Sequence, residues 1–188
     1  MRDGRIVVLP FDTVYGLSCE PHREEPTRRL YRLKGREEGK PAALVAADPD
    51  LLFECLPELR GRVALLLRGL LPGPYTLVVP NPARRFRWLT GSTPDRIGVR
   101  IPDLPEPTLS IVASVGCVVA TSANLAGGPD PRRLDEVPEE IRAGCALAVD
   151  GGELPGAPST VVDLTGPEPV VLRVGAVPAA EALARLSG

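Results

Sequence analysis

The sequence predicts an α/β fold, a single domain built on a twisted, mixed sheet. Short apolar runs that are typical of strands alternate along the chain with amphipathic stretches that are typical of helices. Hydrophobic residues make up 44% and charged residues 24% of the chain, as in ordinary globular domains. The 188 residues suffice for one well-buried core but not for two, so we expect one domain over residues 1–188.

The first predicted elements are a strand, a helix and a second strand. An apolar run over residues 5–9 that is closed by a proline predicts a short buried strand. Residues 26–34 place two leucines on one helical face, and Gly35 should end this helix. Residues 42–47 predict the second strand.

Two helices and two strands should follow. The helix over residues 48–56 has a good N-cap in Asp48, and a proline occupies its first turn. A second helix is predicted over residues 58–70, because a Pro-Gly-Pro sequence ends it. Residues 75–79 and 97–101 are predicted to be strands, and the connection between them is rich in arginine.

The remaining strands and helices are predicted after residue 106. A helix over residues 107–115 opens with a proline in its first turn. It leads into residues 117–121, whose continuous apolar run is typical of a strand buried on both faces. The remaining predictions are a helix over residues 135–142, strands over 146–149, 160–164 and 170–174, and an amphipathic helix over 178–186.

Composition argues against several classes of protein. The four cysteines are irregularly spaced and only one histidine could join them, so a zinc site is not expected. Free cysteines are typical of a reducing compartment, and we expect a cytoplasmic protein. No apolar run approaches the roughly 20 residues of a membrane helix. A net charge of −2 disfavours a protein that mainly grips a nucleic-acid backbone, yet allows a local basic cavity for a small anion.

Lysine use is the most unusual feature of the composition. Of the 22 basic residues only Lys34 and Lys40 are lysines, and both lie in one seven-residue stretch. A lysine is a compact point charge, whereas arginine is a planar fork, so the stretch suggests a charge directed at a phosphate or carboxylate. A GC-rich genome or a hot habitat would also explain the scarcity of lysine, though not its clustering.

The lysine stretch does not match a P-loop, because it has too few residues between its glycines, Pro41 follows the second lysine, and a helix precedes it. Two interpretations of residues 34–40 remain. Two lysines and Arg36 on a glycine-flanked turn could converge on a triphosphate. Alternatively, the turn is solvated and its glutamates pair with neighbouring basic residues.

Two further segments carry candidate site residues. Ser122 and Asn124 follow a buried strand, and like Thr13 they lie where ligands bind in open α/β sheets, beyond a strand's carboxyl end. The same residues could simply cap the next segment. Arg100 lies within an apolar strand and needs an anionic partner, which is either an internal carboxylate or a bound one.

Taken together, seven segments resemble the YrdC-like family and occur in its order, from about residue 6 to residue 175. They are Leu9-Pro-Phe-Asp-Thr-Val-Tyr-Gly-Leu17, Lys34-Gly-Arg36 with Lys40-Pro41, Trp88-Leu-Thr-Gly91, Val99-Arg-Ile-Pro102, Thr121-Ser-Ala-Asn124, Ser159-Thr-Val-Val-Asp163 and Leu172-Arg173. The resemblance implies a twisted α/β fold around a concave cavity. It also implies an L-threonylcarbamoyladenylate synthase, which joins ATP, L-threonine and bicarbonate, releases pyrophosphate and serves the threonylcarbamoyladenosine modification of tRNA.

By the same resemblance, the ATP-binding residues are Lys34, Arg36, Lys40, Ser122, Asn124 and Arg173, and the threonine-binding residues are Thr13, Arg100 and Ser159. Lys34 and Arg36 would act in catalysis by stabilising charge on the leaving pyrophosphate, with Mg²⁺ as a helper. The product would pass to a tRNA-modifying transferase complex. No nucleophilic cysteine or general-base histidine is needed for this chemistry.

The chain departs from the family pattern at several positions. Phe11 stands where members usually have threonine, and Glu37 and Val174 replace usual prolines; the helix that normally precedes the first strand is not seen. We expect the Phe11 ring to pack in the core rather than to enter the cavity. Alternative functions are a divergent or non-catalytic paralogue that binds nucleotide or RNA, and a domain that uses carbamoyl phosphate.

Overall fold

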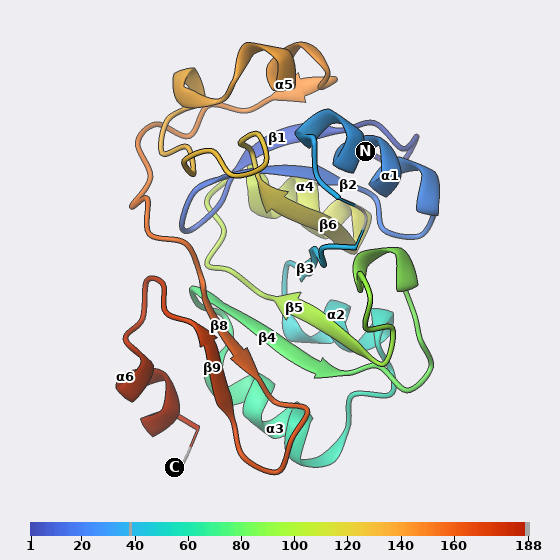
Figure 1. Ribbon diagram of the computed structural model, residues 1–188, viewed down its shortest axis with the longest axis vertical. Coiled ribbons are helices and arrows are strands. Elements are labelled where there is room, and N and C mark those ends of the chain that lie inside the picture. The colour runs from blue at the N-terminus through green and yellow to red at the C-terminus, as the bar shows by residue number, and fades with distance from the viewer. Residues whose placement is uncertain (38, 187–188) are drawn as a thin grey trace.

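A computed structural model describes residues 1–37 and 39–186 and contains one nine-stranded sheet (Figure 1). The strand order is β7-β1-β2-β6-β3-β5-β4-β8-β9. The strands are β1 (Val7–Pro10), β2 (Tyr15–Cys19), β3 (Ala43–Ala46), β4 (Tyr75–Pro80), β5 (Arg96–Arg100), β6 (Cys117–Ser122), β7 (Leu147–Ala148), β8 (Thr160–Asp163) and β9 (Val170–Arg173). The predicted mixed α/β fold is therefore confirmed.

Helices pack against both ends of the sheet and against its central strands. The α-helices are α1 (Glu24–Lys34), α2 (Pro49–Cys55), α3 (Gly61–Leu70), α4 (Thr108–Val115), α5 (Glu139–Ala143) and α6 (Ala179–Ala184), and the 3₁₀ helices are η1 (Arg87–Leu89) and η2 (Leu134–Glu136). In Figure 1, α1 and α5 lie with β1 and β2, whereas α3 and α6 lie with β4, β8 and β9 at the other end. α2 and α4 pack against the central strands β3 and β6. No helix within the described residues is long and apolar enough to cross a membrane.

The sheet mixes both kinds of pairing. β1 with β2, β2 with β6, β6 with β3, β5 with β4 and β8 with β9 are antiparallel, while β7 with β1, β3 with β5 and β4 with β8 are parallel. The β3–β5 pair lies at the centre of the order. It therefore joins the half of the sheet that carries β1, β2 and β6 to the half that carries β4 and β8.

Alternation along the central strands divides the core between the two faces of the sheet. Cys117 and Val119 of β6 belong to the larger core cluster, whereas Val118 and Ala120 belong to a second cluster on the opposite face. All four residues are buried. This confirms that β6 is covered on both faces, as its unbroken apolar sequence predicted.

The predicted ends of α1 and α2 are also confirmed. Gly35 follows α1 in the left-handed region, with φ of 63°, and its N–H donates to the carbonyl of Arg32. Asp48 caps α2, because its side chain accepts from the N–H of Leu51 at 2.9 Å.

Two local predictions differ from the structure. The helix expected over residues 135–142 is divided into η2 and α5, and Pro138 lies between them, where it lacks the N–H that a continuous helix would need. β2 was not predicted, since Gly16 and Ser18 weaken its strand signal. Pairing with β1 on one side and β6 on the other nevertheless places β2 within the sheet.

Replacing the α2 cap should lower stability measurably. Asp48→Ala should reduce the free energy of unfolding by about 1 kcal/mol, because the N–H of Leu51 loses its side-chain acceptor. Asp50→Ala is the matched control: this neighbouring, exposed residue pairs with Arg68 at the surface, where a few tenths of a kcal/mol are typical. Urea denaturation of both variants measures the difference, and equal losses would contradict the capping role.

Candidate active site

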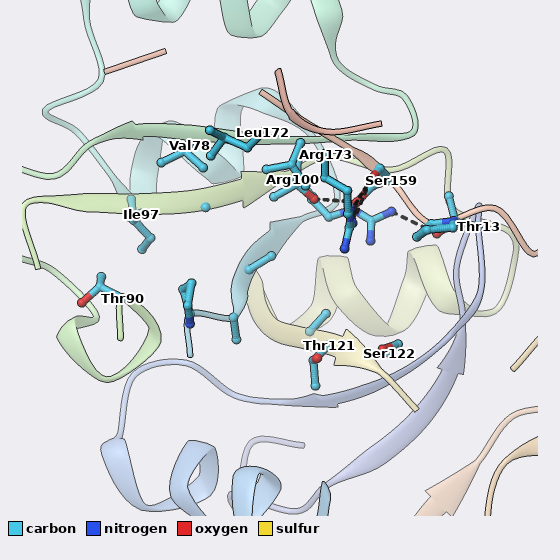
Figure 2. Close-up of a pocket in the computed structure, with 18 of the residues that line it drawn as sticks. Thr13, Val78, Thr90, Ile97, Arg100, Thr121, Ser122, Ser159, Leu172 and Arg173 are labelled. Carbon is cyan, nitrogen blue, oxygen red and sulfur yellow. Dashed lines mark hydrogen bonds between the residues drawn. The ribbon is translucent and has the colours of Figure 1, made fainter. Parts of the chain in front are cut away.

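A cavity of about 510 Å³ opens between the two halves of the sheet (Figure 2). Strands β3, β4, β5, β6, β8 and β9 all contribute to its wall. Its lining includes Thr90 and Thr93 from the loop after η1, and apolar side chains such as Val78 and Leu172. This volume accommodates a nucleotide-sized ligand rather than an ion alone.

The structure brings six of the nine predicted site residues together in this cavity. They are Thr13, Arg36, Arg100, Ser122, Ser159 and Arg173. Lys34 and Asn124 lie behind the wall and are 2% and 6% exposed. Lys40 is exposed outside the cavity lining, with its ammonium 3.8 Å from a Glu37 oxygen.

The buried Lys34 ammonium joins the end of α1 to the end of β6. Its Nζ lies 2.6 Å from the carbonyl oxygen of Ser122 and 2.8 Å from that of Asn124, and the side-chain oxygens of the same two residues are further acceptors for its three N–H groups. Burial, followed by the charge of Arg36, lowers the pKa of Lys34 to about 8. Because this value still exceeds 7, the ammonium remains the main form at neutral pH and lies just behind Ser122.

Arg100 has an internal partner, which sequence analysis had left open. Its Nη2 lies 2.8 Å from Asp12 Oδ1 and donates to Thr13 Oγ1 at 3.3 Å. Burial raises the pKa of the Asp12 carboxyl, although the Arg100 charge opposes the shift. The Nε of Arg100 and the Oδ2 of Asp12 are buried without a hydrogen-bond partner among the described residues. Asp12 thus holds the guanidinium that forms one end of the cavity.

Arg173 lies beside Arg100 at the same end (Figure 2). Its Nη2 donates to the Ser159 carbonyl at 2.8 Å and to Ser159 Oγ at 3.2 Å. Thr76 Oγ1 lies 2.8 Å from the same hydroxyl. Burial lowers the pKa of Arg100, Asp12 opposes this, and the nearby Arg173 charge lowers it further. Two guanidinium groups and two hydroxyls therefore meet at this end.

Arg36 supplies a second source of positive charge. Its Nη2 donates to the Pro41 carbonyl at 2.6 Å, and the guanidinium lies 5.9 Å from the centre of the Tyr31 ring. Within the described part of the chain, neither Arg36 nor Arg173 forms an ion pair. Their charges are available to an anionic ligand.

The Phe11 ring packs in the core behind the cavity wall, as expected, and its centre lies 6.0 Å from the Arg100 guanidinium carbon. The residue is 2% exposed and belongs to the core cluster that includes Leu9 and Val118. The ring covers Gly16, where an added Cβ would lie 2.6 Å from a ring carbon. The unusual aromatic residue therefore fills space behind the Thr13 loop.

Several residues of the site were not predicted as such. Asp12 precedes the predicted Thr13, and Asp163 is the last residue of another family-like segment. Both could therefore have been proposed from the sequence. Arg96 and Asp163 line the far end of the cavity and form an ion pair of 3.1 Å. The signal for Arg96 is its even spacing from Arg100, since alternate residues of a strand share a face.

The comparisons with known proteins agree with this architecture. A sequence model of the Sua5/YciO/YrdC family, described as "Telomere recombination", matches residues 1–175. Threonylcarbamoyl-AMP synthase of Pyrococcus abyssi is 34% identical over 182 residues, which cover 96% of this chain and 53% of that protein. Threonylcarbamoyl-AMP synthase of Escherichia coli is 36% identical and covers 88% of each chain. The chain spans about half the length of several curated relatives.

Solved structures give the same result for the fold. The crystal structure of P. abyssi Sua5 complexed with L-threonine has a TM-score of 0.82 and 32% identity, over 98% of this chain and 54% of that chain. Escherichia coli YciO has a TM-score of 0.79 and 24% identity, over 97% and 88% of the two chains. From the family match and these similarities, the chain belongs to the Sua5/YciO/YrdC family.

Proposed function

We propose that this protein makes threonylcarbamoyl-AMP from L-threonine, bicarbonate and ATP, with release of pyrophosphate. The observation that carries the proposal is a nucleotide-sized cavity that combines a hydroxyl- and arginine-rich end at Thr13, Ser159 and Arg173 with further positive charge at Arg36. Relatives named threonylcarbamoyl-AMP synthase and a relative crystallised with L-threonine support this assignment.

The amino-acid end of the cavity suits the polar groups of threonine. Arg173, together with the buried Arg100 behind Thr13, would attract the carboxylate, since guanidinium groups favour bidentate contacts with planar anions. The hydroxyls of Thr13 and Ser159 would contact the remaining polar groups. A hydroxyl-lined site rejects valine because valine would leave these groups unpaired.

The phosphates of ATP would lie toward Arg36, Ser122 and the buried Lys34 charge. Lys34 would act partly through the Ser122–Asn124 turn that its ammonium fixes, and Asn124 would act as part of the same turn. Lys40 would contribute from the exposed side of the site. Positive charge stabilises the leaving pyrophosphate more than the bound substrate, which is what lowers a barrier.

The reaction needs positioning more than a covalent catalyst. The threonine amine and bicarbonate condense to a carbamate with loss of water. A carbamate oxygen then attacks the α-phosphorus of ATP, and the bond to the bridging oxygen of pyrophosphate breaks. Because the carbamate is a weak and unstable nucleophile, the enclosing wall and fixed cations supply orientation and protection from water.

Magnesium fits this site as a companion of the phosphates. No group of three or more His, Cys, Asp or Glu residues that could hold a metal exists within the described residues. Asp130 lines the cavity and acts electrostatically on Lys34, and it would be the protein ligand to a Mg²⁺ ion that is otherwise held by the phosphates and water. Bound Mg²⁺ would neutralise phosphate charge.

We further propose that the protein acts in the cytoplasm and that its labile product passes to a tRNA-modifying transferase complex.

ATP binding should depend on Arg36. Arg36→Ala should weaken ATP binding roughly tenfold to a hundredfold, because it removes one charge-assisted phosphate contact. Arg32→Ala is the matched control, since this exposed arginine lies two residues before Lys34 and pairs with Glu25. Calorimetric titration with ATP and Mg²⁺ measures both. Equal affinities in wild type and Arg36→Ala would overturn the phosphate assignment.

Threonine affinity should fall when the planar guanidinium of Arg100 is replaced. Arg100→Lys should raise the threonine KM at least about tenfold, since an ammonium cannot hold Asp12 and Thr13 in the same geometry. Arg96→Lys provides a control on the same strand at the other end of the cavity and should change it little. Pyrophosphate release against threonine concentration decides between them. An unchanged Arg100→Lys profile would show a purely structural arginine.

Phe11 should affect stability rather than amino-acid choice. Wild type should already release pyrophosphate faster with threonine than with serine or valine, because the ring lies outside the cavity. Phe11→Thr should keep this order while the free energy of unfolding falls by about 3 kcal/mol, as for large-to-small core substitutions. Selectivity that appears only in Phe11→Thr would mean that the ring obstructs the site. Absence of threonine dependence in both proteins would favour a nucleotide-binding paralogue.

A further inference from the structure

Residues 150–158 form a strap that links two distant strands of the sheet. β7 is the first strand in the sheet order and β8 is the eighth, so this connection passes six intervening strands. Figure 1 shows it, in orange, running along one side of the molecule from the half that contains β1 to the half that contains β4. The strap ends at Pro158, which lines the cavity directly before Ser159.

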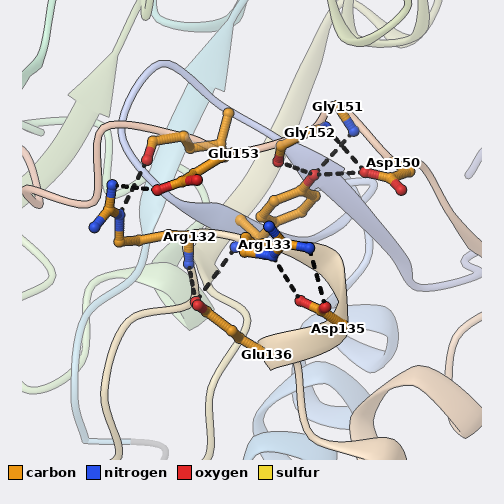
Figure 3. Close-up of polar contacts among 10 residues, drawn as sticks. Arg132, Arg133, Asp135, Glu136, Asp150, Gly151, Gly152 and Glu153 are labelled. Carbon is orange, nitrogen blue, oxygen red and sulfur yellow. Dashed lines mark hydrogen bonds and ion pairs between the residues drawn. The ribbon is translucent and has the colours of Figure 1, made fainter.

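The start of the strap is held by a buried tyrosine hydroxyl (Figure 3). Tyr15 Oη accepts from the N–H of Gly151 at 2.9 Å and donates to the carbonyl of Gly152 at 2.8 Å. The N–H of Tyr15 donates to the carbonyl of Pro131 at 2.9 Å. Tyr15 therefore ties both the strap and the segment before Arg132 to β2.

Arg132 holds the middle of the strap. The N–H of Leu154 donates to the Arg132 carbonyl at 2.9 Å, and Arg132 Nε donates back to the Leu154 carbonyl at 3.2 Å. Arg132 Nη2 also pairs with Glu153 at 2.7 Å. The methylene groups of the same arginine lie against Gly156, where any added Cβ would collide with them. Main-chain, side-chain and packing contacts thus converge on one residue.

The strap in turn fixes the loop that carries Thr13. The N–H of Gly156 donates to the Thr13 carbonyl at 2.8 Å, directly beyond the contact between Gly156 and Arg132. The hydroxyl of Thr13 accepts from Arg100 on the other side. A shift of the strap would move the Thr13 backbone, while Arg100 would stay in place because it belongs to β5 and pairs with Val45 of β3.

We propose that Arg132, which is not among the cavity-lining residues, is a positioning residue for the amino-acid end of the cavity. It fixes the strap, and through the N–H of Gly156 the strap fixes Thr13. The inference rests on the proposed function and deepens it, because it assigns threonine affinity to a side chain outside the cavity. Among the described residues, no hydrogen bond joins Arg36 or Ser122, at the nucleotide end, to residues 150–158.

Arg133 offers a matched control. It is adjacent in sequence and about as exposed as Arg132, with side chains 55% and 49% exposed. Its guanidinium pairs with Asp135 in η2 at 3.2 Å rather than with the strap (Figure 3). Arg133→Ala therefore removes a surface arginine while the contacts of Arg132 with the strap remain.

The test is steady-state pyrophosphate release by the full chain, with threonine and ATP varied separately. Arg132→Ala should raise the threonine KM about tenfold, as expected when one hydrogen bond to a charged group is lost, and should leave the ATP KM within twofold. Arg133→Ala should leave both within twofold. Gly156→Ala should reproduce the Arg132→Ala profile, because it displaces the same contact from the other side and strains a residue with φ of 88°.

The outcomes separate this inference from the proposed function. If wild type depends on threonine and Arg132→Ala has an unchanged threonine KM, or loses ATP and threonine affinity equally, the positioning role is overturned and the synthase assignment stands. If wild type shows no threonine dependence, both fall. Hydrogen exchange gives a second readout: the Gly156 amide should exchange faster in Arg132→Ala but not in Arg133→Ala, and equal exchange in both would also overturn the proposal.

Discussion

The burial of one ammonium group is the constraint on which the site depends. An isolated charge in a protein interior costs several kcal/mol, so Lys34 can be buried only where oxygens surround it. Ser122 and Asn124 provide these oxygens from the end of β6. The end of α1 and the turn after β6 are therefore held together, and Ser122 is presented at the cavity wall in one orientation.

The arginines of the cavity are of two kinds, those that pair with an aspartate and those that do not. Arg96 and Arg100 lie on β5 and are each paired with an aspartate, so they form fixed walls with little net charge of their own. Arg36 and Arg173 instead donate to carbonyl oxygens, which leave their charge uncompensated. Uncompensated positive charge therefore comes from Arg36 in the loop after α1 and from Arg173 on β9, with the buried Lys34 charge behind Ser122, and an anionic ligand would lie between them.

The order of most strands and helices could be predicted from sequence. The spacing of apolar residues, the helix caps and the glycines that end helices are all local properties of the chain. Gly35 and Asp48 behave as their sequence positions indicate. β2 could not be predicted in this way, since its place in the sheet depends on pairing with β6, which is distant in sequence, as well as with the preceding β1. The partner of Arg100 was undetermined for the same reason: burial required an anion, but only the folded chain shows that Asp12 supplies it.

The structure explains why position 34 is a lysine in a chain that otherwise uses arginine. A tetrahedral ammonium can donate to several oxygens around one point, whereas a planar guanidinium would not fit among the acceptors of Ser122 and Asn124. The Lys34 charge is thus directed first at the protein itself. Among the described residues, no contact accounts in the same way for lysine at position 40, which is exposed beside Glu37.

The pairing of β2 with β6 has a consequence for how the protein folds. Leu17 lies opposite Thr121, more than a hundred residues further along the chain, and β1 pairs with β7 across a still longer interval. Closing such loops costs entropy before any contact between the strands can offset it, so this topology slows folding. The cavity takes part of its wall from β6 and from the still later β8 and β9. Nascent chains released before β6 and β8 are synthesised would carry a hydrophobic sheet edge without its neighbours, and chaperones or proteases would meet them in that form.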